Sequence, residues 1–215
     1  MSEKPMPNIA FDLQRIHRVI TRGLTVLEEN CHFFAESGFP DETTCEGFWK
    51  YCQALEANIQ GHHMAEDDIF FPFVAPRLPE RDIPRLSLEH QVLANTLGQM
   101  KASREAGSLV DLGPELSKLA GVWYPHIHKE ETWFSPEIMG QVLTVPEHID
   151  LAQKTAAHSA AHAQPAPLCV PFLLYNAEPE DRAFYMNAMP PELTQQLVPI
   201  VWKDEWAAMK PFLLN

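Results

Sequence analysis

Hydrophobic residues recur at intervals of three and four along most of the chain, not at the intervals of two that mark strands. This spacing places apolar side chains on one face of a helix and predicts an all-α protein. Four long amphipathic helices are expected, over residues 9–36, 44–70, 84–106 and 114–134. Their number and the moderate connections between them favour an antiparallel four-helix bundle.

Local signals suggest where two of these helices begin. Thr43 with Glu46 three residues later has the pattern of a capping box for the second helix. Pro114 is expected in the first turn of the fourth helix, where a missing N–H does no harm. Pro125 falls inside that helix and is expected to kink it.

The composition and the pattern of the sequence change near residue 140. Residues 1–140 are therefore assigned to the bundle and 141–215 to a helical C-terminal extension. The extension contains an Ala-rich helical candidate (TAAHSAAHA), a proline-rich connector (QPAPLCVP) and two short helices over 179–189 and 191–209. Its aromatic and leucine side chains would form an exposed patch if left free. We therefore expect it to pack on the bundle or on a second subunit in a homodimer.

The composition limits the kinds of binding partner that the protein is expected to have. A net charge of −13 argues against nucleic acid and against an anionic membrane surface, because both require concentrated Lys and Arg. No apolar run approaches the ~20 residues needed to span a bilayer, and no signal peptide is evident. We expect a soluble, cytoplasmic protein. Its cysteines show no zinc-ligand spacing and are interpreted as free thiols.

Two similar segments interrupt the apolar stripes with polar residues. HHMAEDDIFFP (62–72) and HIHKEETWFSP (126–136) each place a histidine four residues before a glutamate, as His62 with Glu66 and His126 with Glu130. Residues four apart on a helix point in nearly the same direction, here into the core. A buried carboxylate is unfavourable unless it is paired or binds a metal.

The first and third helices each supply one more inward histidine, His17 and His90. Four helices thus direct histidines inward beside two carboxylates that can bridge. Imidazole and carboxylate without thiolate favour iron, manganese or zinc. Bridging carboxylates hold two metal ions close enough for both to act on one small molecule.

In the order and spacing of these residues, the segment from about 9 to 140 resembles the hemerythrin-like (HHE cation-binding) domains. The resemblance implies a four-helix bundle with two non-haem iron ions, bridged by the two glutamates. It implies as metal ligands His17, His62, Glu66, His90, His126 and Glu130. The ferritin-like di-iron bundles place Glu before His, which is the reverse order.

The chain departs from the oxygen-carrying members at one position. Their third helix supplies two histidines four residues apart, whereas here Ala94 follows His90. The nearest replacement is His63, at the edge of the inward stripe, with Asp67 one turn later to orient it. Because a residue at the edge must rotate to reach the core, we expect His63 to stay outside and one coordination position to remain open.

His158 and His162 are interpreted as a surface pair, because no further ligand is evident nearby.

The function expected from these residues is binding or sensing of dioxygen or a related small molecule, nitric oxide or peroxide. A di-iron oxidase or peroxidase using the open position is an alternative. A regulatory iron or redox sensor, whose C-terminal segment responds to metal occupancy, is another.

Overall fold

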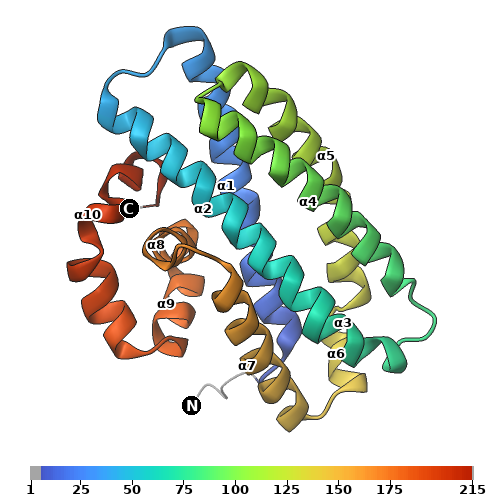
Figure 1. The fold of residues 1–215 in the computed structure, drawn as a ribbon. Coiled ribbons are helices and arrows are strands. Elements are labelled where there is room, and N and C mark those ends of the chain that lie inside the picture. Colours follow the sequence, from blue (N-terminus) through green and yellow to red (C-terminus); the bar gives the residue numbers. More distant parts are fainter. Residues whose placement is uncertain (1–5, 215) are drawn as a thin grey trace.

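The computed structural model describes residues 6–214, and every regular element in that part of the chain is helical. The expected all-α fold is confirmed. Four long helices lie alongside one another (Figure 1). They are α1 (Ile9–Ser37), α2 (Glu42–Ala65), α4 (Ile83–Ala106) and α5 (Leu109–Trp133).

The starts of α2 and α5 differ from the expectation. The cap of α2 is Asp41, whose carboxylate accepts a hydrogen bond from the Thr44 amide at 2.7 Å. The expected capping box of Thr43 and Glu46 is therefore wrong, because Thr43 already lies in the first turn. Helix α5 begins five residues before Pro114 and is capped by Ser108. Pro114 and Pro125 both lie inside α5, which continues past them.

The polypeptide continues in helical form beyond the end of α2. One π-helical turn, η1 (Glu66–Phe70), leads into α3 (Phe71–Val74) and a short 3-10 turn, η2 (Ala75–Arg77). π-helical turns are rare within helices, and those that occur often lie at functional sites. Here it begins at Glu66, one of the inward-facing acids.

Most of the interior consists of two large hydrophobic clusters with a polar layer between them, and a third, small cluster is formed by Ala57, Ala163 and Cys169. On α1, for example, His17 lies between Leu13 of one cluster and Ile20 of the other. Along the α2–η1 segment, α4 and α5, the inward polar residues likewise lie between residues of the two large clusters. The buried polar positions between the clusters are His17 on α1, His62 and His63 on α2, Glu66 on η1, His90 on α4, and His126 and Glu130 on α5.

The C-terminal part of the described chain forms shorter helices. They are α6 (Pro136–Val142), α7 (Val145–His162), α8 (Ala166–Asn176), α9 (Pro179–Ala188), η3 (Leu193–Val201), α10 (Lys203–Trp206) and η4 (Ala207–Phe212). The proline-rich connector expected at QPAPLCVP is wrong, since most of it belongs to α8. Pro165 precedes that helix and Pro167 lies in its first turn, where proline is tolerated.

These helices bury apolar side chains against the long ones. Phe172, Met209 and Phe212 belong to the same core cluster as Leu55 of α2. Arg22 of α1 donates a hydrogen bond to the Phe212 carbonyl oxygen at 3.1 Å. Helix α8 lies beside α2 in Figure 1. The division of the chain into a bundle and an extension at residue 140 stays a prediction.

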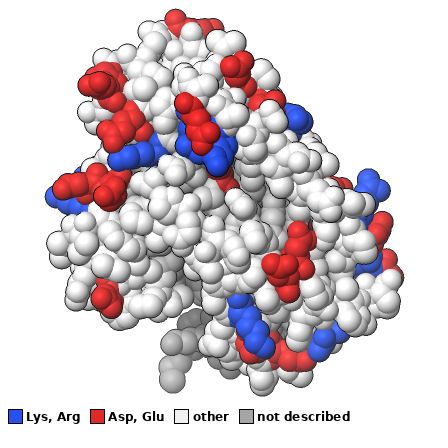
Figure 2. All heavy atoms as spheres, in the orientation of Figure 1, with Lys and Arg blue, Asp and Glu red and all other residues white. Residues whose placement is uncertain are grey.

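The surface carries charges of both signs. In the view of Figure 2, acidic and basic side chains are interspersed among wide uncharged areas. Within residues 6–214, no helix has the length and apolar character required to cross a membrane.

Candidate metal centre

The six side chains expected to bind metal are all inside the protein, and each is at most 4% exposed. They come from the four long helices and η1. The structure also places a seventh side chain among them, that of His63. The seven form two groups of potential ligand atoms, and within each group these atoms lie within 4.8 Å of one another.

The first group consists of His17, His62, Glu66 and Glu130. The His17 Nε2 atom lies 3.2 Å from Glu130 Oε2, and the His62 Nε2 atom lies 3.5 Å from Glu66 Oε2. Two imidazoles and two carboxylates thus converge from α1, α2, η1 and α5. Such a donor set suits a cation that prefers nitrogen and oxygen ligands.

The second group consists of His63, His90 and His126. The rings of His63 and His90 stack with their centroids 4.0 Å apart, and His90 Nε2 lies 3.0 Å from His126 Nε2. The expectation that His63 stays outside is wrong, since its side chain is 5% exposed. Helix α4 packs against the side of α2 that carries His63, so the edge of the apolar stripe of α2 is also buried. Ala94 is exposed and lies outside this group.

Both glutamates contact histidines of both groups. Glu130 approaches His17 through Oε2 and His126 through Oε1, at 3.2 Å in each case. Glu66 Oε2 lies 3.5 Å from the Nε2 atoms of both His62 and His90. The two carboxylates therefore occupy the boundary between the groups, which is where bridging ligands belong.

Many of these buried atoms have no hydrogen-bond partner among the described residues. They are the Nε2 atoms of His17, His62 and His63, the Nδ1 atom of His90, and both carboxylate oxygens of Glu66 and Glu130. A buried polar atom left without a partner destabilises a fold by about 1–3 kcal/mol. So many together indicate that the partner is a cation. The residues present fit metal ions.

Burial and neighbouring charges set the protonation of the cluster. Burial, together with the Glu130 and Asp67 carboxylates, raises the pKa of Glu66 well above its usual value. Burial opposes ionisation of Glu130 as well, but contacts with His126, His17 and His90 hold its pKa well below the usual value. Burial and the other imidazoles lower the pKa values of His62 and His63. Burial opposes protonation of His17 and His90 as well, but contacts with Glu130 and with Glu131 or Asp67 raise their pKa values. Metals bind these groups in their deprotonated forms, so metal binding would displace protons from the cluster.

A second set of carboxylates contacts the outer nitrogen of three histidines. The Nδ1 atom lies 3.0 Å from Glu131 Oε1 in His17, 3.0 Å from Asp67 Oδ2 in His90, and 3.0 Å from Glu89 Oε2 in His126. In His17 and His126 the contact is a hydrogen bond, which keeps the proton on Nδ1 and directs the Nε2 lone pair inward. In His90 the Nδ1 atom is close to Asp67 but makes no hydrogen bond with it. These arrangements are typical of metal-binding histidines.

Sequence reasoning missed two of these carboxylates and misassigned the third. Asp67 lies against His90, not His63, and accepts a hydrogen bond from the Ser87 hydroxyl at 2.6 Å. Glu89 is adjacent to His90 in sequence but contacts a histidine of α5 instead. In the sequence, each of these acids stands next to a candidate ligand, and this was the signal that could have identified them. Only the packing of the helices shows which histidine each acid contacts.

Aromatic rings enclose the cluster. Trp123 lies edge-on to His17 with ring centroids 5.8 Å apart, and its Nε1 donates to the Thr21 hydroxyl at 2.9 Å. Phe71 stacks on His90 with centroids 5.4 Å apart. These side chains limit the access of water to the site.

The remaining histidines lie elsewhere. His148, which carried no expected role, is buried and its Nδ1 accepts a hydrogen bond from the Ile9 amide at 3.2 Å. His32 and His128 are exposed. His158 lies 3.0 Å from the Asp68 carboxylate, so a further potential ligand is present beside the pair of His158 and His162.

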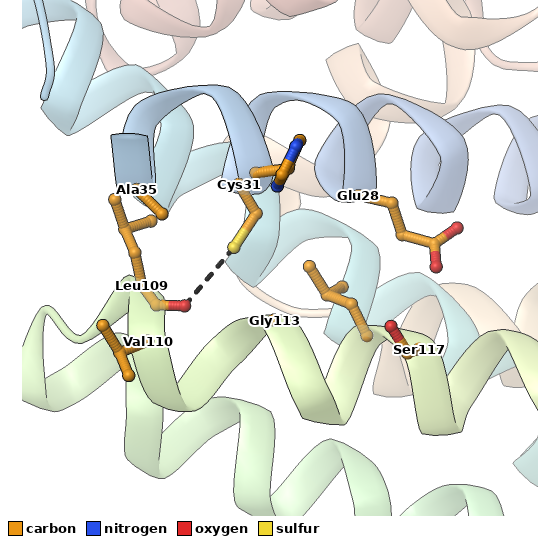
Figure 3. Close-up of a pocket in the computed structure, with 9 residues that line it drawn as sticks. Glu28, Cys31, Ala35, Leu109, Val110, Gly113 and Ser117 are labelled. Atoms are coloured by element: carbon orange, nitrogen blue, oxygen red, sulfur yellow. Dashed lines mark hydrogen bonds between the residues drawn. The ribbon is translucent and has the colours of Figure 1, made fainter. Parts of the chain in front are cut away.

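A pocket of about 430 Å³ between α1 and α5 is separate from the cluster (Figure 3). Its Cys31 lies about 20 Å from His17 along α1, at roughly 1.5 Å per residue. The Cys31 thiol donates to the Leu109 carbonyl oxygen at 3.5 Å, and burial raises its pKa. The protonated thiol is a poor metal ligand, so the histidine cluster is the candidate centre.

Comparison with known proteins supports the same assignment. No curated protein and no solved structure matches the chain significantly. The family model of the hemerythrin HHE cation binding domain matches residues 8–138, which is more than half of the chain. The matched segment includes all four long helices and all seven clustered side chains. The chain belongs to the hemerythrin HHE cation-binding domain family.

Proposed function

We propose that this chain holds two iron ions, bridged by Glu66 and Glu130, inside an antiparallel bundle of the four long helices. The centre binds dioxygen or a related small molecule, nitric oxide or peroxide. The observation that carries this proposal is the set of buried imidazole and carboxylate atoms that face one another without hydrogen-bond partners among the described residues. Membership of a cation-binding family supports it.

The division of the ligand atoms into two groups supports two ions. His17 and His62 would hold one ion, and His63, His90 and His126 the other. Glu66 and Glu130 reach both groups and would complete both coordination shells. His63 takes the place of the histidine that the third helix lacks at Ala94.

The choice of iron follows from the donor atoms and the family. The ligands are imidazole nitrogens and carboxylate oxygens, and none of the four cysteines belongs to either group. Iron, when bound, supplies reversible electron transfer and affinity for dioxygen and nitric oxide.

The surrounding residues position the ligands and shield them. Glu131 and Glu89 would hold protons on Nδ1 of His17 and His126, which would fix the inward tautomer of these two ligands. Aromatic rings cover the cluster and its side chains are almost fully buried, so only a small molecule would reach it.

Metal analysis of anaerobically purified protein tests the proposal, with absorption spectra before and after exposure to air. Two iron ions per chain and a new absorption band on exposure are expected. Glu66→Ala and Glu130→Ala should each lose iron, whereas His128→Ala, at an exposed position of α5, should keep it. Two ions retained in both glutamate variants would refute the ligand assignment.

The same preparation separates a carrier from an enzyme. A carrier returns to its original spectrum when oxygen is removed. An oxidase or peroxidase consumes a reductant over many turnovers.

A regulatory sensor is favoured by one contact, between Asp68 of η1 and His158 of α7. Because η1 also carries Glu66, a change at the centre can reach the C-terminal helices. A sensor therefore predicts that metal loading changes the protease sensitivity of residues 141–215. Equal digestion of metal-loaded and metal-free protein would exclude it.

A further inference from the structure

The two carboxylates that form hydrogen bonds with ligand histidines from outside have different surroundings. Glu131 lies 3.0 Å from the Nδ1 atom of His17, and no lysine or arginine in the described part of the chain forms an ion pair with it. Glu89 lies 3.0 Å from the Nδ1 atom of His126 and is also paired with the ammonium group of Lys129. Of these two carboxylates, only Glu89 is therefore neutralised by a cation.

Lys129 reaches Glu89 from the same side of α5 as His126. The two residues are three positions apart on the helix, so their side chains are neighbours. Glu89 of α4 contacts both of them, His126 through Oε2 and Lys129 through Oε1. Arg85, one turn earlier on α4, places its Nε atom 3.5 Å from the same Oε1. One carboxylate thus connects a buried imidazole to cations nearer the surface.

The exposure of these side chains increases outward from the metal centre. The exposed fraction is 0% for His126, 19% for Glu89 and 28% for Lys129. The Arg85 side chain is 65% exposed, so solvent screens its charge more strongly. The pair of Lys129 and Glu89 is mostly shielded from water, where charges interact more strongly.

An ionised carboxylate at Nδ1–H makes an imidazole a better ligand, and a cation on the other carboxylate oxygen opposes this effect. We propose that Lys129, acting through Glu89, weakens the donation of His126 to its metal ion and raises the reduction potential of the centre. The effect on the potential rests on the proposed function, the iron centre, whereas the effect on His126 applies to any bound divalent cation. His17, whose partner Glu131 has no such cation, keeps the stronger donation.

Titration of metal-free, full-length protein with Co²⁺ tests the effect on His126, with the visible absorption of the bound ion as the signal. Lys129→Met should raise the cobalt affinity by about three-fold or more, because the loss of a nearby positive charge favours a bound cation. Lys129→Arg keeps the charge and should match the wild type. Lys118→Met should also match it, since that lysine pairs with Glu115 elsewhere on α5.

A second pair of variants tests the role of Glu89. In Glu89→Gln the amide oxygen can still accept a hydrogen bond from His126, but the negative charge is lost. Adding Lys129→Met to Glu89→Gln should change the cobalt affinity less than Lys129→Met does alone. An equal change in both backgrounds would mean that Lys129 acts directly on the ion, and would overturn the proposal.

The reduction potential of the iron-loaded protein tests the remaining part. An oxidised centre carries more positive charge than a reduced one, so Lys129→Met should lower the potential and Lys129→Arg should leave it unchanged. A lower cobalt affinity or an unchanged potential in Lys129→Met would overturn the proposal, because the lysine would then only hold Glu89 in place. Protein that binds no iron but shows the expected cobalt affinities would refute the iron centre and still support the action of Lys129 on His126.

Discussion

Gly61 of α2 lies against the backbone of Ser159 on α7, so closely that a Cβ atom at residue 61 would be 2.7 Å from the carbonyl oxygen. The opposite flank of α2 faces α4, where His63 stacks on His90. Helix α2 is therefore covered on both sides. This is why a histidine at the edge of the expected stripe is buried.

The same close approach occurs at Gly47, where an added Cβ would lie 1.9 Å from the Ala208 carbonyl oxygen. Gly47→Ala forces two backbones apart and is expected to destabilise the protein by about 1–3 kcal/mol, as overpacking does. Urea unfolding measures the change. Gly98→Ala is the matched control, because no described atom lies within 4 Å of its Cβ. That variant should gain up to about 1 kcal/mol from helix propensity. Equal stability of the two variants would contradict this close packing of η4 on α2.

Arg104 of α4 neutralises the buried Glu56 of α2, with Nε at 3.1 Å and 3.2 Å from the two carboxylate oxygens. Arg104→Ala leaves that carboxylate unpaired and should destabilise the fold by about 2–3 kcal/mol at pH 7. Burial raises the pKa of Glu56 and Arg104 opposes the rise, so without Arg104 the carboxyl takes up a proton more readily. The deficit should therefore shrink as the pH falls. Lys154→Ala, which removes an exposed pair with Asp150, should change stability by less than about 0.5 kcal/mol. A deficit independent of pH would show that Glu56 is not the cause.

Burial lowers the pKa of His148 below its ordinary value of 6.5, although Glu147 opposes the shift. The unfolded chain therefore binds this proton more readily than the folded one, and stability is lost as the pH falls from 6.5 toward the folded pKa. His148→Asn keeps an acceptor for the Ile9 amide but does not titrate. Thermal unfolding between pH 7.5 and 5 should show the wild type losing stability relative to the variant. Parallel profiles would mean that His148 does not contribute.

Substitution of His63 tests whether the second ligand group binds metal. If it binds metal, His63→Ala should lower metal affinity by about ten-fold or more and open a coordination position, so that azide binds more tightly. Iron content and azide titration followed by absorption measure both effects. His128→Ala serves as the control on an exposed histidine. Azide binding that is the same in His63→Ala and the wild type would show that His63 packs at the centre without being a ligand.

Helix geometry alone was enough to predict part of this site. His62 and Glu66 share a helix face because they are four residues apart, and His126 and Glu130 repeat the relationship. The structure brings all four together with His17 and His90, while their roles as ligands stay predictions. The family and the all-α fold are confirmed.

The burial of His63 and the partners of Glu89 and Asp67 depend on which helices become neighbours. No local pattern contains that information. Helix α8 was missed for a different reason. Its prolines resemble a linker, yet two of them fall where a helix tolerates proline and Pro171 is held within the buried core.

Anomalous diffraction at the iron absorption edge, from crystals of the protein as isolated, tests the central claim most directly. The account predicts two iron peaks between the carboxylates of Glu66 and Glu130. One should lie against His17 and His62, and the other against the group formed by His63, His90 and His126. A single peak, or no iron between these carboxylates, would contradict it.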